Sequence, residues 1–205
     1  MEPIRLIVNS DYLCPWCYNG TVRVRRLQEE FGDRIQIEWR SYLLRPQPDP
    51  HRTLEKFKAY TQSWLRPASD PDGGTFRVCE GDAGPPSHSI PPHLVAKAAA
   101  TISDDAFHRV HDRLLHAYFA ENRDITDDAT LRAIWREAEL PDDAFARSAD
   151  AELLQQTIDQ HNEAVALGID GVPCVRMEGR DGWITGAQPL EIYRRWIERS
   201  LRAKD

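Results

Sequence analysis

The chain has only four cysteines and two methionines among its 205 residues, and it contains no long apolar run. No stretch reaches the roughly 18 apolar residues that a membrane-spanning helix needs, so no contact with a membrane is expected. Basic residues are in the minority, since 26 Lys and Arg stand against 33 Asp and Glu, for a formal net charge of −7. This balance does not favour binding to nucleic acid or to an anionic membrane surface.

The N-terminal residues lack the features of a secretion signal. The segment MEPIRLIVNSDYL has a short apolar run with a carboxylate before it and no small-residue cleavage site after it. We therefore expect a cytoplasmic protein. Because thiols are mostly reduced in that compartment, catalysis or metal binding explains four cysteines better than structural disulfides do.

Two of the cysteines stand close together in the segment SDYLCPWCYNG, residues 10–20. Cys14 and Cys17 form a Cys-Pro-Trp-Cys motif between an apolar run and an amphipathic segment. Pro15 suits the first position of a helix, where its missing N–H would have no partner anyway. Cys14 would then lie at the helix N-terminus, where unpaired N–H groups and the helix dipole favour a thiolate.

The pattern after the motif gives the two cysteines different surroundings. Small or apolar residues recur at three- and four-residue steps, as on the buried face of a helix: Cys17, Gly20, Val24, Leu27 and Phe31. Cys17 should therefore face inward, while Cys14 at the helix tip should be exposed. An exposed attacking thiol with a shielded resolving thiol is the arrangement that thiol–disulfide exchange needs, and a C-x-x-C between a strand and a helix is typical of a redox motif.

Residues beside the two cysteines are expected to tune them. Pro15 fixes the start of the helix, and Trp16 brings apolar surface rather than charge. Asp11, just before the motif, either caps a turn or disfavours a nearby thiolate by charge repulsion.

The C-x2-C spacing also suits half of a zinc site, with Cys79, His88 and His93 as further candidate ligands. Against this interpretation, the chain has no second C-x2-C pair, and Pro15 with an inward-facing Cys17 favours redox geometry. We therefore predict no metal site and no cofactor.

The hydrophobic pattern divides the chain into three parts. Residues 1–50 predict a strand, a helix and a second, alternating strand. Residues 51–167 predict mainly helices, with a Pro-, Gly- and Ser-rich loop over 68–92. Residues 168–205 predict a hairpin and a final helix. The order of elements is that of an α/β fold with an inserted helical segment.

Three segments resemble the DsbA-like thioredoxin-fold oxidoreductases, especially their cytoplasmic FrnE-type branch: SDYLCPWCYNG, GVPCV at 171–175 and GAQPLE at 186–191. The resemblance covers the chain from end to end. It implies a thioredoxin fold made of residues 1–50 plus 168–205, with residues 51–167 as an inserted α-helical domain.

In that family a Val-Pro bond downstream of the motif is cis and lies against the C-x-x-C. The resemblance therefore implies a cis bond at Pro173, with Val172 offering its backbone to an extended substrate. It also implies thiol–disulfide exchange, or disulfide isomerisation, through Cys14 and Cys17. The expected partners are a disulfide-containing protein or small molecule, and glutathione or another low-molecular-weight thiol.

Two further cysteines are open to more than one interpretation. Cys174 stands where the family commonly has Thr after the cis proline, so it could resolve or trap a mixed disulfide. Cys79, in a short piece over 76–80 that could be extended, could be a redox partner or a ligand. Alternatively, both are small buried residues, since free cysteine is among the most buried residue types.

Two other functions compete with the oxidoreductase. One is a glutathione-linked isomerase of small aromatic carboxylates, an activity of a related branch of the fold; those enzymes typically carry Ser where Cys14 stands, so the intact pair argues against it. The other is a non-catalytic binding module that uses the cleft between the helical insertion and the motif, together with a zinc ion or a structural disulfide. Replacing Cys14 by Ser would separate them, because exchange would be lost while simple binding would remain.

Overall fold

The computed structural model describes residues 2–203. Its strands and helices are, in chain order, β1 (Ile4–Ser10), α1 (Pro15–Phe31), η1 (Gly32–Arg34), β2 (Ile35–Ser41), α2 (Leu54–Thr61), η2 (Gln62–Trp64), α3 (Leu65–Ala68), α4 (Ile90–Ala100), α5 (Asp104–Phe119), α6 (Asp128–Glu137), η3 (Asp142–Ala149), α7 (Ala151–Ala166), β3 (Cys174–Met177), β4 (Trp183–Thr185) and α8 (Leu190–Arg202). The elements labelled η are short 3-10 helices. Within residues 2–203, none of the helices is both long and apolar enough to cross a membrane.

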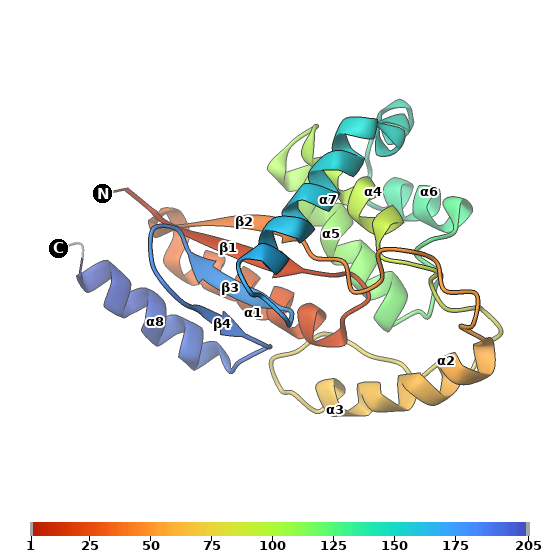
Figure 1. Ribbon diagram of the computed structural model, residues 1–205, viewed down its shortest axis with the longest axis horizontal. Coiled ribbons are helices and arrows are strands. Elements are labelled where there is room, and N and C mark those ends of the chain that lie inside the picture. Colours follow the sequence, from red (N-terminus) through yellow and green to blue (C-terminus); the bar gives the residue numbers. More distant parts are fainter. Residues whose placement is uncertain (1, 204–205) are drawn as a thin grey trace.

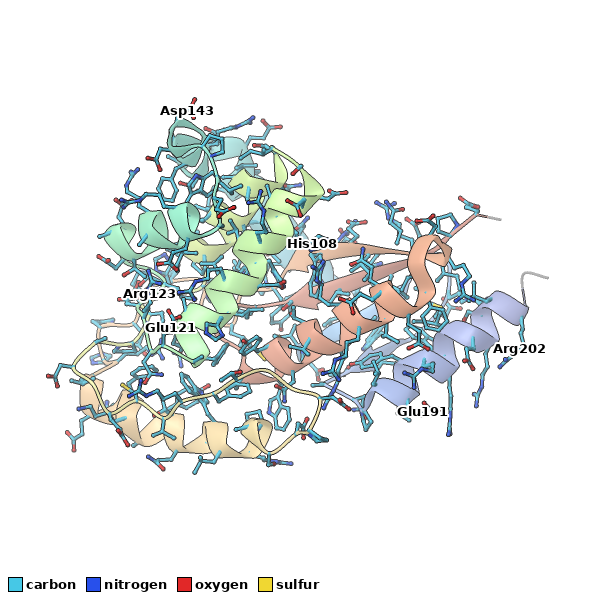
Figure 2. All side chains as sticks on the ribbon, turned by 180° about the vertical axis from the view of Figure 1, so that it is seen from behind. His108, Glu121, Arg123, Asp143, Glu191 and Arg202 are labelled. Atoms are coloured by element: carbon cyan, nitrogen blue, oxygen red, sulfur yellow. The ribbon has the colours of Figure 1, made fainter. Side chains whose placement is uncertain are left out.

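One four-stranded sheet, in the order β2-β1-β3-β4, forms the base of the fold. β1 and β2 run parallel, whereas β3 is antiparallel to both β1 and β4. Helices α1 and α8 cover one face of the sheet, and α7 lies on the other (Figures 1 and 2). The strand–helix–strand start and hairpin–helix end agree with the α/β thioredoxin fold expected from the sequence.

Alternation along the strands directs their apolar side chains to the face that α1 and α8 cover. The cluster there consists of Ile4, Leu6, Val8, Val24, Leu27, Phe31, Ile35, Val175, Met177, Tyr193 and Ile197. This core holds the middle and the end of α1 against β1 and β3, and so fixes the helix whose first turn carries the motif after the end of β1.

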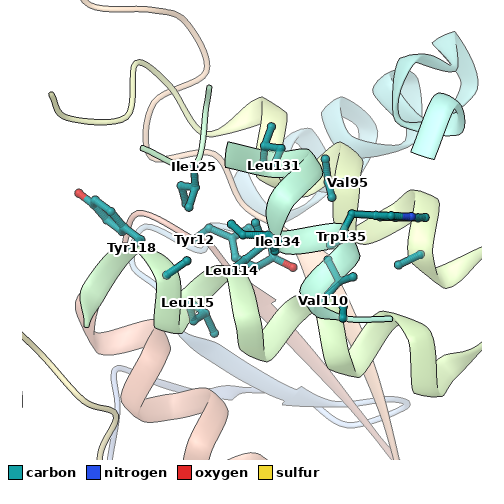
Figure 3. Packing of buried hydrophobic residues seen from close by; sticks show 14 of the residues in the cluster. Tyr12, Val95, Val110, Leu114, Leu115, Tyr118, Ile125, Leu131, Ile134 and Trp135 are labelled. Carbon is teal, nitrogen blue, oxygen red and sulfur yellow. The ribbon is translucent and has the colours of Figure 1, made fainter. Parts of the chain in front are cut away.

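The helices between β2 and β3 build a second core (Figure 3). Its largest fully buried side chains are Trp64, Trp135, Tyr118 and Phe119. Tyr12, Leu13 and Tyr18 belong to the same cluster, although they flank the two motif cysteines. The helical insertion therefore packs directly on the segment that carries the motif.

The first residues of the loop between α3 and α4 are held against α1 by hydrogen bonds and an ion pair. Asn19, fully buried, donates from Nδ2 to the carbonyl of Pro67 (2.9 Å) and accepts from the N–H of Gly74 at Oδ1 (2.8 Å). The guanidinium of Arg23, also buried, lies 2.6 Å from Asp70. A Cβ on Gly74 would overlap the ring of Tyr18. This part of the loop is thus packed rather than free.

Four details differ from the sequence pattern, which predicts a helix over residues 54–65 that Pro67 stops, Thr126 as a helix cap, a short extended piece over residues 76–80, and Val165 on the inner face of its helix. The first helical segment after residue 51 does not stop before Pro67, because a 3-10 turn restarts the helix as α3 and places the proline in its first turn, where a missing N–H costs little. Asp127 rather than Thr126 caps α6, accepting from Thr130 at 2.8 Å, while the Thr126 hydroxyl donates to Asp124.

Residues 76–80 form no strand, since the N–H of Cys79 donates to the Thr61 hydroxyl (3.0 Å) instead of to a neighbouring strand. Val165, expected on the inner face of α7, is 51% exposed, whereas its neighbour Ala164 is the buried residue of that last turn.

Candidate active site

Cys14 occupies the N-cap of α1, with extended backbone angles, and Pro15 takes the first helical position. The sulfur of Cys14 accepts a hydrogen bond from the N–H of Cys17 (3.2 Å). This is the bond that a capping side chain makes to an unpaired helical donor. The backbone thus directs a donor and the positive end of the helix dipole at the sulfur, as the sequence indicated.

Both cysteines are free thiols, and both are buried. Cys17 is 0% exposed, in agreement with its place on the inner stripe of α1, but Cys14 is only 5% exposed. The expectation of an exposed Cys14 is therefore wrong. The Cys14 thiol is covered because it lies 3.4 Å from the carbonyl oxygen of Val172, to which it can donate.

The environment of Cys17 keeps its proton in place. Burial raises the pKa of the Cys17 thiol well above its usual range, and a hydrogen bond with the Cys14 side chain adds to this effect. The backbone of Asp11 and the side chain of Ser10 act in the opposite direction. Cys17 is thus a protonated thiol at neutral pH.

The segment around Pro173 meets the start of α1 across a long separation in sequence. The Val172–Pro173 peptide bond is cis. The Pro173 ring lies against Gly20, where a Cβ would come within 2.8 Å of the proline Cγ. Val172 and Pro173 therefore adjoin the motif.

The other two cysteines lie in packed interiors. Cys174 is 0% exposed and packs with Ala164 and Ile169, and burial raises the pKa of its thiol to about 12. Val175, the next residue, faces the α1 side of the sheet, so Cys174 faces away from α1. Cys79 is 3% exposed in the helical core. These positions favour the interpretation of both as buried core residues.

The Asp11 side chain connects the turn before Cys14 with the segment that follows β2. Its buried carboxylate accepts from the N–H of Leu13 (2.6 Å) and from that of Leu44 (2.8 Å), which lies after β2. Burial raises the pKa of Asp11 to about 6, although these hydrogen bonds and Arg45 oppose the shift. Of the two roles expected for this residue, the structure shows the turn cap.

Within residues 2–203, no three His, Cys, Asp or Glu side chains are grouped so that they could hold a metal ion. His93 is buried against the ring of Tyr12 (4.8 Å between centroids), and its pKa is lowered to about 3 by burial. Cys79 is fixed in the helical core.

A family model described as a DSBA-like thioredoxin domain matches residues 5–198. The chain belongs to this family. Family membership makes it an enzyme of the thiol–disulfide oxidoreductase class.

Two solved structures are similar to this fold, and one further protein is similar in sequence. The structure of DsbM from Pseudomonas aeruginosa, described as a cytosolic disulfide reductase, is similar with a TM-score of 0.76 and 21% identity, over 97% of this chain and 99% of that one. SCO1869 from Streptomyces coelicolor, described as a probable DsbA oxidoreductase, gives a TM-score of 0.78 and 24% identity, over 97% and 90%. The ClpXP adapter protein SpxH of Shouchella clausii is 26% identical, over 98% of this chain and 68% of the relative.

Sequence reasoning missed the cations that surround the motif in this DsbA-like fold. The guanidinium carbon of Arg66 lies 5.7 Å from the centroid of the Trp16 ring. Arg45 and Arg52 line a cavity of about 270 Å³ that Leu13, next to Cys14, also lines. The available signal was the pair of arginines within the proline-rich link LLRPQPDPHR, whose composition otherwise indicates only a connection.

Proposed function

We propose that the chain catalyses thiol–disulfide exchange with Cys14 as the attacking thiol and Cys17 as the resolving thiol. The observation that carries this proposal is the Cys14 sulfur at the N-terminus of α1, hydrogen-bonded by the Cys17 N–H. Pro15 and Trp16 shape the motif, and Val172 and Pro173 form the wall against which a substrate backbone would lie.

In the first step the Cys14 thiolate attacks one sulfur of the substrate disulfide. A Cys14–substrate mixed disulfide forms, and the other substrate sulfur leaves as a thiolate that takes a proton from water. In the second step Cys17 loses its proton and attacks the Cys14 sulfur. A Cys14–Cys17 disulfide forms and the second substrate thiol is released, so the substrate gains two electrons and the protein loses two. The reverse sequence oxidises a dithiol.

The buried, protonated Cys17 has a consequence for this sequence. A thiol must lose its proton before it attacks, and the raised pKa of Cys17 delays that loss. The mixed disulfide on Cys14 is thus expected to live longer than it would beside a solvent-exposed resolving thiol.

We further propose that the protein works in the cytoplasm and that a low-molecular-weight thiol such as glutathione recycles it. Two descriptions of DsbM support this proposal, since that protein is called cytosolic and one of its structures contains glutathione, with a TM-score of 0.77 and 21% identity to this chain.

Cysteine variants test the proposed roles. The fully reduced protein is mixed with bis(2-hydroxyethyl) disulfide and followed by mass spectrometry, with Cys79→Ala/Cys174→Ala as the background. We expect this background protein to form the internal disulfide, Cys17→Ser to accumulate the mixed disulfide, and Cys14→Ser to do neither. Undiminished exchange by Cys14→Ser would show that the nucleophile has been misassigned.

A binding role without turnover is the second candidate, and the similarity to the adapter protein SpxH favours it. In that case Cys14→Ser would bind a partner as the wild type does, and the pair would show no reversible two-electron transition in glutathione buffers. A transition with a defined midpoint would favour the enzyme, and the midpoint would tell whether it acts as oxidant or reductant.

A further inference from the structure

A basic cavity includes Leu13, the residue before Cys14, although the chain as a whole carries a net charge of −7. A cavity of about 270 Å³ is lined by Leu13, Leu44, Arg45, Arg52, Tyr60 and Tyr118. A second cavity, of about 250 Å³, shares Arg45, Arg52 and Tyr60, and it adds Lys56 and His51 together with one acidic residue, Asp49. Helix α2, which supplies Lys56 and Tyr60, lies beyond the end of the sheet at which β1 leads into α1 (Figure 1).

The backbone at Arg45 is held in a fixed place relative to the motif. The N–H of Arg45 donates to the Ser89 hydroxyl (3.0 Å), and its carbonyl accepts from the Ser89 N–H (2.8 Å). The preceding N–H, that of Leu44, donates to the Asp11 carboxylate, which also caps the turn before Cys14. Arg45 and Cys14 are therefore anchored through the same buried carboxylate.

The two arginines are not neutralised by close carboxylates. Arg45 is 3.8 Å from Asp49, and both side chains are about two-fifths exposed, a separation and exposure at which an ion pair is weak. Arg52 donates to the carbonyl of Pro86, and it forms no ion pair within 4 Å among residues 2–203. Both guanidinium groups thus keep donors for an anion.

A buried polar group also borders the first cavity. Tyr118 is 1% exposed, and its hydroxyl has no hydrogen bond of normal geometry within the described part of the chain. Tyr118, Arg45 and Arg52 line the same cavity, and both arginines oppose the increase that burial causes in the pKa of Tyr118. A ligand with an acceptor oxygen would satisfy this donor.

The first cavity adjoins the motif through Leu13, the residue before Cys14. Tyr60 lines both cavities and is 41% exposed. Burial raises the pKa of Tyr60; a charge on Cys14 raises it further, whereas Arg52 and Arg45 lower it. Tyr60 thus shares both cavities with the two arginines, and a charge on Cys14 acts on its hydroxyl.

We propose that Arg45 and Arg52 bind a carboxylate of the substrate, and that the substrate is a small disulfide carrying carboxylate groups. The inference rests on the proposed function, since it assigns the substrate class of the same thiol pair. The fork of a guanidinium matches a carboxylate with two parallel hydrogen bonds. A small molecule fits better than a protein, because the cavities are of small-ligand size and the thiol is only 5% exposed.

The test compares three disulfides of different charge in single turnovers with the reduced protein. The probes are glutathione disulfide, which carries carboxylates, bis(2-hydroxyethyl) disulfide, which is neutral, and cystamine, which is cationic. We expect Arg45→Gln/Arg52→Gln to slow the reaction with glutathione disulfide by about tenfold or more, because the charge-assisted hydrogen bonds to its carboxylates are lost. The arginine variant should react with the neutral probe at a rate within about twofold of that of the wild type. Added salt should slow the reaction of the wild type with glutathione disulfide only.

Arg195→Gln is the matched control, since it removes one exposed positive charge from α8 and should leave all three rates unchanged. A second measurement follows binding without any reaction. S-methylglutathione should bind to the Cys14→Ser protein, and adding the two arginine substitutions should weaken that binding by about tenfold, the factor expected for the reaction rate.

The outcomes separate the two proposals. If the wild type reacts with none of the disulfides, the proposed function fails. If it reacts with all three but the arginine variant slows them equally, or slows none, exchange stands and the substrate inference is overturned. A wild type that prefers an acidic protein disulfide while ignoring the charge of small disulfides would also overturn it.

Discussion

Gly20 lies where α1 meets the segment around the cis proline, and its lack of a side chain permits that contact. A Cβ there would lie 2.8 Å from Cγ and 3.2 Å from Cβ of Pro173, closer than such atoms normally approach. The proline ring cannot rotate away as a flexible side chain could, so the backbone of one segment would have to move.

We therefore expect Gly20→Ala to destabilise the protein, although alanine favours a helix. Overpacking costs about 1–3 kcal/mol, whereas the helix gains only about 0.5–1 kcal/mol from the substitution. Urea denaturation would measure the difference. Gly81→Ala is the control, because a Cβ added at Gly81 would have no neighbouring atom within 4 Å in the described part of the chain. A Gly20→Ala protein as stable as the wild type would contradict this packing.

Asp11 makes the stability of the protein depend on pH, because burial raises its pKa from 3.8 to about 6. The folded state therefore holds the proton more tightly than the unfolded state does. The contribution of Asp11 to stability is full below about pH 4 and falls as the pH rises to about 6. One pKa unit corresponds to about 1.4 kcal/mol, so the decrease is of the order of 3 kcal/mol.

Asp11→Asn should remove this contribution to the pH dependence. The difference in free energy of unfolding between the variant and the wild type should shift in favour of the variant as the pH rises from about 4 to 7. Urea denaturation across this range measures it. A constant difference would show that Asp11 does not titrate differently in the folded state.

At the scale of elements, the start of the loop after α3 is joined to α1 by an ion pair in which Arg23 is buried and Asp70 is partly exposed. Arg23 is 4% exposed, and it donates both to Asp70 (2.6 Å) and to the carbonyl of Ala187 (2.6 Å) before α8. One guanidinium thus links the loop, α1 and the segment between β4 and α8. Removing one partner of a buried pair leaves the other charge uncompensated.

We expect Asp70→Asn to loosen the loop without unfolding the protein. Trypsin should cleave after Arg66 and Arg77, which bound this part of the loop, several times faster than in the wild type. Asp82→Asn is the control in the same loop, since Asp82 is fully exposed and lies 3.8 Å from Lys58. Equal cleavage rates for the two variants would argue against a role of the ion pair in holding the loop.

For the whole molecule, buried histidines join the helical part to the sheet. His111 of α5 contacts the Tyr12 hydroxyl (2.7 Å), the Thr21 hydroxyl (3.3 Å) and the ring of Trp39 on β2 (4.5 Å between centroids). Burial lowers the pKa of His111 well below its usual value and that of His93 to about 3. Both residues are neutral in the folded protein at neutral pH.

Mild acid should therefore weaken the fold. In the unfolded chain these histidines take up a proton near pH 6.5, whereas in the folded protein they do not, so their contribution to stability is lost as the pH falls below 6.5. Between pH 7.5 and 5, each of the two histidines should lower the free energy of unfolding by about 2 kcal/mol. The protonation of Asp11 over the same range offsets part of this decrease. Urea denaturation at the two pH values tests the prediction, and His93→Gln should reduce the decrease. A wild type equally stable at both values would contradict it.

The sequence by itself determined the order of elements and the chemistry of the motif, because these depend on neighbours along the chain. Proline after Cys14 fixes a helix start, and a three- and four-residue repeat places Cys17 on the inner side of that helix. Only the tertiary structure decided what depends on segments distant in sequence. It covers Cys14 with Val172, turns Cys174 away from α1, and places Arg45 and Arg52 in a cavity that Leu13 also lines. Burial and electrostatic surroundings come from such distant partners, which local patterns do not specify.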